Sequence, residues 1–437
     1  MGELLRALRK HTSLPQTALA HMAGMTQGTV SKLLSGHTRY QHQGRIDAAL
    51  SGLGARVGQR EPQRCSPTVI DHDEFPGTPV EAVRHAQILW RRDLGGSSHT
   101  NLSPLSSEQL TTASLRWLID RPSPIPEARA ADGREVSHAH VDAIERTCDM
   151  FTALDHEFGG GHARTAAVQY LHSEVGPLLR GNYAPDTGRR LYAASARLTA
   201  KVGATGYDAG LHALARHYFM QSMALAHAAG DRAMGAKALA LLSHQANLLG
   251  EAHSAVDLAR TAQAGTADSA TPAVRAMLAA MEARGRATLG DASGATRALH
   301  EMEQAFHHIG PEDPSWMGYF DGSEVADEFA HCFHDLGYGA TAIDHAQLSV
   351  KLAPESLRRS RTFAALVSAS AHLRMACPDP EAACALARAA ITDAGHLRSA
   401  RVRAYITRLR SDLAPYASSR HVREFDEFLS EAPVAQA

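Results

Sequence analysis

The sequence lacks several features that mark common protein classes. No apolar run approaches the ~20 residues of a membrane helix, and the N-terminal segment MGELLRALRK has no apolar core of signal-peptide length. The chain has five cysteines in 437 residues, without a CxxC pair. An odd number of scattered cysteines is typical of reduced thiols, so we expect a cytoplasmic protein that does not enter a membrane.

Motifs of catalysis and cofactor binding are also missing. We find no Gly-rich phosphate loop, no GxSxG elbow and no paired carboxylates. Residues 156–162 resemble a zinc-protease motif, but the two histidines are six positions apart with three glycines between them, so a turn between helices is expected. His331 and His334 flank Cys332, a spacing that chance explains among 26 histidines. We therefore expect no enzyme, no cofactor and no metal. Arg164, which follows the glycines, is a candidate anion ligand at a helix start.

Lysine is scarce, and the charge is uneven. Arginine supplies 39 of the 44 basic residues, which suggests a GC-rich genome as readily as any function. The net charge of −2 combines +6 in residues 1–60 with −8 in the remainder. A basic segment joined to an acidic one is what phosphate binding confined to one domain produces. The 44% hydrophobic and 21% charged residues are ordinary for a globular protein of two or three domains.

Residues 14–36, LPQTALAHMAGMTQGTVSKLLSG, predict a helix-turn-helix. Apolar residues form one helical face before Gly24 and another after it. Gly24 stands where the first helix must stop and reverse, and Thr26 can cap the second. A hairpin that merely packs would not leave Gln27, Thr29, Ser31 and Lys32 together on one outward surface.

This stretch resembles the phage-repressor (XRE) class of DNA-binding domains, matched at Gln16, Leu19, Ala20, Gly24, Thr29, Val30 and Gly36. The resemblance implies a lambda-repressor-like domain that binds double-stranded DNA through the major groove, as a pair on a pseudo-palindromic operator. It places eight residues at base edges or phosphates: Gln16, Thr26, Gln27, Gly28, Thr29, Ser31, Lys32 and Arg39.

The rest of the chain predicts an all-α protein. Prolines at 62, 67, 76 and 79 indicate a linker over 61–79, between the 1–60 domain and a helical connecting region at 80–189. Helices are expected at 80–94, 107–120, 137–157, 162–179 and 189–201, with Ser106 and Gln109 as a capping box for the second.

Residues 190–437 repeat a pattern of small residues. Five lead alanines, at 215, 255, 295, 342 and 383, are each followed by further small or apolar residues four and seven positions later. Another small residue precedes each by twelve positions, at Gly203, Ser243, Ala283, Ala330 and Ala371. Small residues at these places let two helices cross closely. Leu-Gly pairs at 249, 289 and 336 interrupt the helices six residues before the lead alanine.

These repeats resemble tetratricopeptide repeats, although their spacing of 40 to 47 residues exceeds the family's usual ~34. The resemblance implies an α-solenoid whose first helices line a concave surface. In that family, residues at fixed positions relative to the earlier small residue of each repeat face this surface. In this chain the residues at those positions predict a polar site for a short peptide or small molecule. Asn247 is the preferred single residue, and the predicted site comprises Lys237, His244, Asn247, Arg284, Glu324, Asp327, His331 and His334.

The whole arrangement resembles actinobacterial transcriptional regulators, most of all in the stretches HEFGGGHAR, VQYLHSEV and EFAHCFHDLG. That resemblance implies a homodimeric, signal-responsive regulator. An alternative is a scaffold that binds another protein through the repeat groove and uses the head only to localise on DNA.

Overall fold

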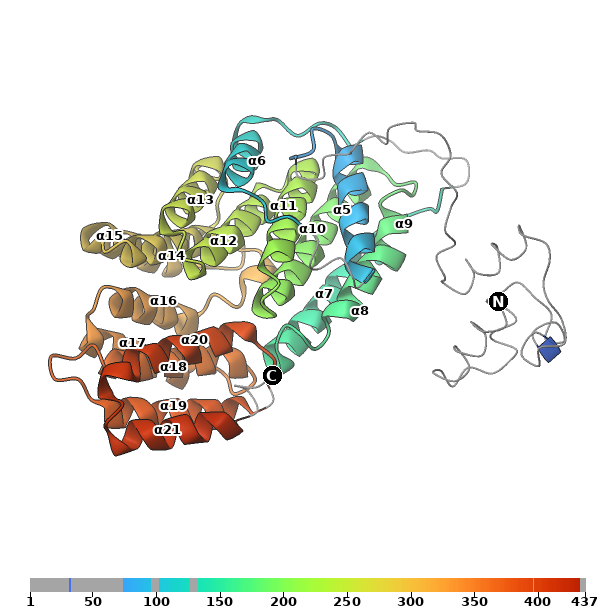
Figure 1. The fold of residues 1–437 in the computed structure, drawn as a ribbon. Helices are drawn as coiled ribbons and strands as arrows, with labels where there is room; N and C mark the ends of the chain where they lie inside the picture. The colour runs from blue at the N-terminus through green and yellow to red at the C-terminus, as the bar shows by residue number, and fades with distance from the viewer. Residues whose placement is uncertain (1–30, 33–73, 96–101, 126–132, 396, 433–437) are drawn as a thin grey trace. The chain divides into compact units, whose positions relative to one another are not determined.

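The computed structural model describes residues 31–32, 74–95, 102–125, 133–395 and 397–432. The chain divides into two units, Met1–Ile70 and Asp71–Ala437. The described part of the second unit is built of helices (Figure 1), and its only strand-like pairing is an isolated bridge between Glu135 and Asn182. The predicted all-α class is confirmed for these residues. Of the predicted DNA contacts, Ser31 and Lys32 are helical and exposed, while Gln16, Thr26, Gln27, Gly28, Thr29 and Arg39 lie outside the described residues.

The region before the hairpins contains helices close to the predicted positions, but the single helix expected at 162–179 begins at Arg164 and is interrupted by a π-helical turn. They are α5 (Pro79–Leu94), α6 (Ser107–Ile119), α7 (His138–Phe158), α8 (Arg164–Tyr170) and α9 (Gly176–Leu178). A π-helical turn, Leu171–Val175, joins α8 to α9. The capping box before α6 is present, since the Ser106 amide donates to Gln109 and the Gln109 amide to Ser106.

Five helical hairpins follow in a solenoid-like array (Figure 1). They are α10 (Pro185–Asp208) with α11 (His212–Ala229), α12 (Arg232–Leu248) with α13 (Ala252–Gly265), α14 (Pro272–Thr288) with α15 (Ala292–Phe306), α16 (Gly322–Asp335) with α17 (Gly339–Leu352), and α18 (Arg358–His372) with α19 (Pro380–Ala394). The helix expected at 189–201 is longer at both ends, because Pro185 begins it and Gly210, in the left-handed region, follows its end.

The small-residue register coincides with the hairpins. In each one, the earlier small residue lies on the first helix and the lead alanine on the second, and all ten residues are buried. The glycines of the three Leu-Gly pairs adopt φ of 75° to 82°, which a residue with a Cβ rarely does. These turns reverse the chain between the paired helices.

A sixth pair of helices, α20 (Ala400–Leu413) and α21 (Arg420–Glu431), continues the array. The first helices of successive hairpins pack on one another, and α20 packs on α18. α20 also contacts α10, the first helix of the array, while α18 contacts α7. The inner row of helices therefore closes on itself.

A buried ionic cluster lies at this closure. Arg359 of α18 donates two hydrogen bonds to the Asp155 carboxylate of α7, at 2.8 and 3.0 Å, and lies 3.3 Å from Asp208 of α10. The Ser399 hydroxyl, which caps α20, donates to Asp208 at 2.8 Å, and Lys201 pairs with Asp155 at 2.6 Å. We call these five residues the closure cluster. It joins segments about 200 positions apart.

Candidate ligand cavity

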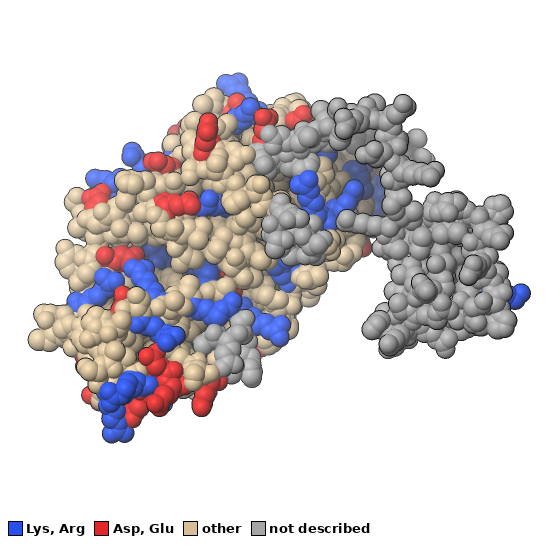
Figure 2. Space-filling model, in the orientation of Figure 1, with Lys and Arg blue, Asp and Glu red and all other residues tan. Residues whose placement is uncertain are grey.

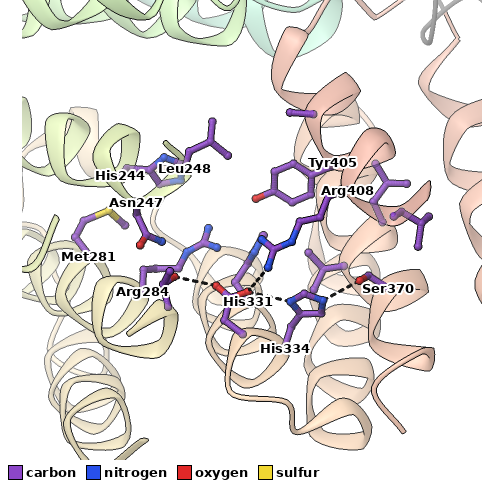
Figure 3. Close-up of a pocket in the computed structure, with 16 residues that line it drawn as sticks. His244, Asn247, Leu248, Met281, Arg284, His331, His334, Ser370, Tyr405 and Arg408 are labelled. Atoms are coloured by element: carbon purple, nitrogen blue, oxygen red, sulfur yellow. Dashed lines mark hydrogen bonds and ion pairs between the residues drawn. The ribbon is translucent and has the colours of Figure 1, made fainter. Parts of the chain in front are cut away.

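A cavity of about 190 Å³ lies among the inner helices α12, α14, α16, α18 and α20 (Figure 3). Polar side chains reach it from several of these helices, and apolar side chains complete its wall. The lining residues that matter for its chemistry are His244 and Asn247 of α12, Arg284 of α14, His331 and His334 of α16, and Tyr405 and Arg408 of α20. Its apolar wall is formed by Leu248, Met281, Leu366, Val367 and Leu409.

Arg284 is the buried cation of the cavity. Its side chain is 9% exposed, and its Nε donates to Glu328 of α16 at 2.7 Å. Burial alone would lower the pKa of Arg284, but the charge of Glu328 outweighs burial and raises that pKa well above its usual value. The guanidinium is therefore charged at every relevant pH.

Two histidines beside Arg284 are held neutral. Burial, together with the charges of Arg401 and Arg284, lowers the pKa of His244 well below its ordinary value. Burial and the charge of Arg284 do the same for His331. The Nδ1 atom of His244 lies 2.9 Å from the Tyr207 hydroxyl, and the His331 ring packs edge-on against Tyr405. Near neutral pH these imidazoles therefore offer hydrogen-bonding groups without charge.

His334 and Asp335 form a hydrogen-bonded network at the other side of the cavity. The Nδ1 atom of His334 lies 3.1 Å from Asp335, and its Nε2 atom lies 2.8 Å from the Ser370 hydroxyl. Asp335 also accepts from Thr288 and lies 3.5 Å from Arg408. Arg408 therefore already has a carboxylate partner, as Figure 3 shows.

Asn247 carries an unused acceptor. Its Oδ1 atom is buried and has no hydrogen-bond partner among the described residues. A buried polar atom without a partner costs free energy, and such atoms are uncommon in folded proteins. A ligand or a water with a donor would satisfy this atom.

Next to the cavity, Lys237, Glu324 and Asp327 form a second, half-buried polar cluster. The Lys237 amino group contacts the Tyr319 hydroxyl and lies 4.1 Å from the ring centroid. Burial lowers the pKa of Lys237 to about 8 and raises that of Glu324 to about 8 and that of Asp327 to about 7. The Asp327 carboxylate lies 3.5 Å from His331, through which this cluster adjoins the cavity.

No protein-family model, curated protein or solved structure matches this chain. We therefore base the function proposed below on the cavity and on the sequence motifs.

The structure brings five of the eight predicted ligand residues to one cavity: His244, Asn247, Arg284, His331 and His334. Lys237, Glu324 and Asp327 do not line it. The prediction placed these residues on a concave surface, and the structure shows that α20 also contributes to the wall around them. Arg284, His331 and His334 are buried.

Sequence reasoning missed the residues that α20 contributes, Tyr405, Arg408 and Leu409. No small-residue pair marks this helix in the repeat register. Its apolar spacing, with Val402, Ile406 and Leu409 on one face, was the available signal, and all three residues are buried.

Arg164 is not a free anion ligand. It is buried, and its Nη2 atom lies 2.5 Å from Asp93, which also accepts from the Tyr218 hydroxyl at 2.6 Å. The glycine run before it is the predicted turn between α7 and α8. Among the described residues, no cluster of three or more His, Cys, Asp or Glu is arranged to hold a metal. No helix in that part of the chain is long and apolar enough to cross a bilayer.

Proposed function

We propose that the protein is a DNA-binding transcriptional regulator whose helical body senses a small molecule. In this proposal residues 1–60 form a phage-repressor-like head, and the hairpins form a tetratricopeptide-like body that also dimerises. The observation that carries the sensing role is the cavity around Arg284 and Asn247. A concave, partly apolar cavity with a few convergent polar groups is the usual form of a small-molecule site.

The charge distribution supports DNA binding by the head alone. Residues 1–60 carry a net charge of +6, and the remainder carries −8. On the face drawn in Figure 2, basic and acidic side chains are interspersed over the described body. Phosphate binding requires an excess of positive charge, and residues 1–60 have such an excess while the remainder of the chain has a negative net charge.

The position of the cavity supports sensing rather than peptide capture. Because α20 contributes to the wall together with α12, α14, α16 and α18, the lining favours a compact molecule over an extended peptide. A compact molecule that contacts α12, α14, α16 and α20 together would favour one arrangement of these helices over others. Such a differential interaction is what would couple ligand binding to DNA binding by the head.

A mobility-shift assay on the DNA upstream of the protein's own gene tests the proposal. We expect a salt-sensitive shift with two copies bound per operator. Gln27→Ala should weaken specific binding by about 1–3 kcal/mol and relax the preference at one base step. Arg39→Ala, at a predicted phosphate contact, should weaken specific and random DNA alike.

Absence of any shift at low salt would overturn DNA-binding regulation, and the alternative of a protein-interaction scaffold would replace it. Equal losses on specific and random DNA for both variants would show that Gln27 is not the base reader.

A further inference from the structure

The terminal nitrogens of Arg284 have no protein partner in the described part of the chain. The Nε atom of Arg284 bonds to Glu328 at 2.7 Å, and no other hydrogen bond or ion pair of this guanidinium is present there. Figure 3 shows the guanidinium pointing into the cavity, from α14 toward the space in front of Tyr405. A planar guanidinium with two terminal donors is suited to bidentate binding of a carboxylate or a phosphate.

The charge around Arg284 favours a singly charged group. Glu328, 2% exposed, already offsets much of the positive charge of Arg284. The other cation of the cavity, Arg408, lies 3.5 Å from Asp335, whose second oxygen accepts from Thr288. His244 and His331 add no positive charge. Arg401, whose charge also acts on His244 and His331, does not line the cavity, because its guanidinium lies against the rings of Tyr207 and Phe363. Among the lining residues, Arg284 is therefore the one guanidinium whose terminal nitrogens can bind a ligand, which suits a carboxylate better than a phosphate dianion.

The remaining lining indicates what else the ligand carries. The unpartnered Oδ1 atom of Asn247 requires an N–H or O–H donor. Leu248, Met281, Val367 and Leu409 offer a short apolar wall. A volume of about 190 Å³ equals that of roughly six water molecules in the liquid, which suits a molecule of amino-acid size and excludes a long peptide.

We propose that the cavity binds a small organic acid, whose carboxylate bonds to the terminal nitrogens of Arg284 and whose hydroxyl or amino donor bonds to Asn247. The assignment rests on the proposed function in one respect only, that such a molecule is the signal that the body senses. The binding site itself stands on the cavity and its contacts.

The test is isothermal titration of the full-length protein with a panel of α-amino and α-hydroxy acids that have short aliphatic side chains. The primary amides of the α-hydroxy acids serve as neutral isosteres, and inorganic phosphate serves as the competing anion. We expect at least one acid to bind with a dissociation constant at or below the millimolar range. The matching amide and phosphate should bind at least ten times more weakly.

Three variants connect binding to the proposed contacts. The double variant Arg284→Met/Glu328→Met removes the charge pair without leaving a buried carboxylate alone, and it should weaken binding of the acid by about 10- to 100-fold. Asn247→Leu should weaken it by about 10-fold. Arg286→Met is the matched control, because Arg286 lies on the same helix and pairs with Glu282 and Asp291 away from the cavity. Its affinity should equal that of the unsubstituted chain.

The proposal fails if no acid of the panel binds, if phosphate binds more tightly than every acid, or if the double variant keeps full affinity while it remains folded by circular dichroism. Sensing fails separately. If an acid binds as expected but leaves the DNA mobility shift unchanged, the binding site is supported and its role as the sensor is refuted. A DNA response to the neutral amides alone would retain sensing and refute the carboxylate.

Discussion

At the residue scale, the ionisable side chains beside the cavity are stabilised in two ways, by ion pairing or by a change of pKa. Arg284 and Glu328 form an ion pair at 2.7 Å, whereas Glu324 and Asp327 have raised pKa values because burial disfavours their ionised forms. Protonation removes the cost of an unpaired carboxylate in such a place. The same region thus contains one close ion pair and two acids that titrate near neutral pH.

Asp327 should make the stability of the body depend on pH. Its pKa rises from 3.8 in the unfolded chain to about 7 in the fold, so between these values the folded protein holds a proton that the unfolded chain has lost. The free energy of unfolding should therefore fall as the pH rises from about 4 to about 7, by an amount on the order of 1–4 kcal/mol from this group. Asp327→Asn should remove that part of the decline in urea unfolding measured at several pH values.

The neighbouring groups set the control for this comparison. Arg284 and Glu328 face Asp327, and both remain in the variant. Glu324, whose pKa is about 8, should still make stability fall with rising pH in both proteins. Parallel stability curves for the two proteins between pH 5 and 8 would show that Asp327 is ionised throughout.

Register alone predicted which polar residues share the inner face, but not how deeply they are buried. Positions counted from Ser243 and Ala330 in the repeat register predicted that His244, Asn247 and His331 face inward. All three line the cavity. Their burial depends on Tyr405 and Arg408 of a helix more than 70 positions further along the chain. A local periodicity contains no information about that distant contact.

At the scale of the elements, close helix crossings at small residues hold each hairpin together. Gly203 of α10 is the tightest example on the first hairpin, since a Cβ there would lie 2.7 Å from the Phe219 ring and 2.9 Å from Tyr218. Both aromatic side chains are fully buried. A crossing of this kind has no room to adjust without moving packed rings.

Gly203→Ala should therefore destabilise the protein by about 1–3 kcal/mol through overpacking, in spite of the better helix propensity of alanine. Gly206→Ala is the matched control on the same helix. A Cβ at Gly206 would meet its nearest neighbours at 3.6 and 4.0 Å, so this change should be neutral or stabilising by up to about 1 kcal/mol. Urea denaturation measures the change in the free energy of unfolding for both variants. Equal changes would mean that steric crowding does not prevent a Cβ at position 203.

The hairpins themselves could be predicted from sequence because their determinants are local. Leu-Gly breaks, capping residues and the spacing of small residues each act within one or two turns. The packing position of α6 could not be predicted, because its Trp117 packs against Gly235 and Gly265, which belong to two other helices. The placement of α20 depends similarly on Arg401, whose guanidinium stacks between Tyr207 of α10 and Phe363 of α18.

At the scale of the whole body, the closure cluster joins the last hairpins to the first helices. Burial alone would raise the pKa of Asp155, but Arg359 and Lys201 hold it well below its usual range. The turn after α7 accommodates the returning chain, because a Cβ at Gly159 would lie 2.5 Å from the Arg398 carbonyl oxygen. Since Ser399 of this segment caps α20, closure of the body also places α20 over the cavity.

Arg359→Met should open this closure. The variant removes a bidentate partner from Asp155 and leaves Asp208, which is 1% exposed, without its guanidinium. Loss of one member of a buried ionic set costs about 3–5 kcal/mol, and Lys201 and Ser399 should keep the loss near the lower value. We also expect faster amide hydrogen exchange along α20 and weaker binding of any cavity ligand, because the wall formed by Tyr405 and Arg408 would no longer be held in place.

The matched control is Arg420→Met, which removes an exposed pair with Glu424 on α21 and should leave stability nearly unchanged, because solvent screens such a pair. Equilibrium unfolding in urea gives the stabilities, and hydrogen exchange resolved by mass spectrometry gives the local openings. If Arg359→Met lost less than 1 kcal/mol and left exchange in α20 unchanged, Ser399 and the stacking of Arg401 would suffice to hold α20. If stability fell while hydrogen exchange rose in α7 but not in α20, the closure cluster would stabilise the first helices of the body and not the position of α20.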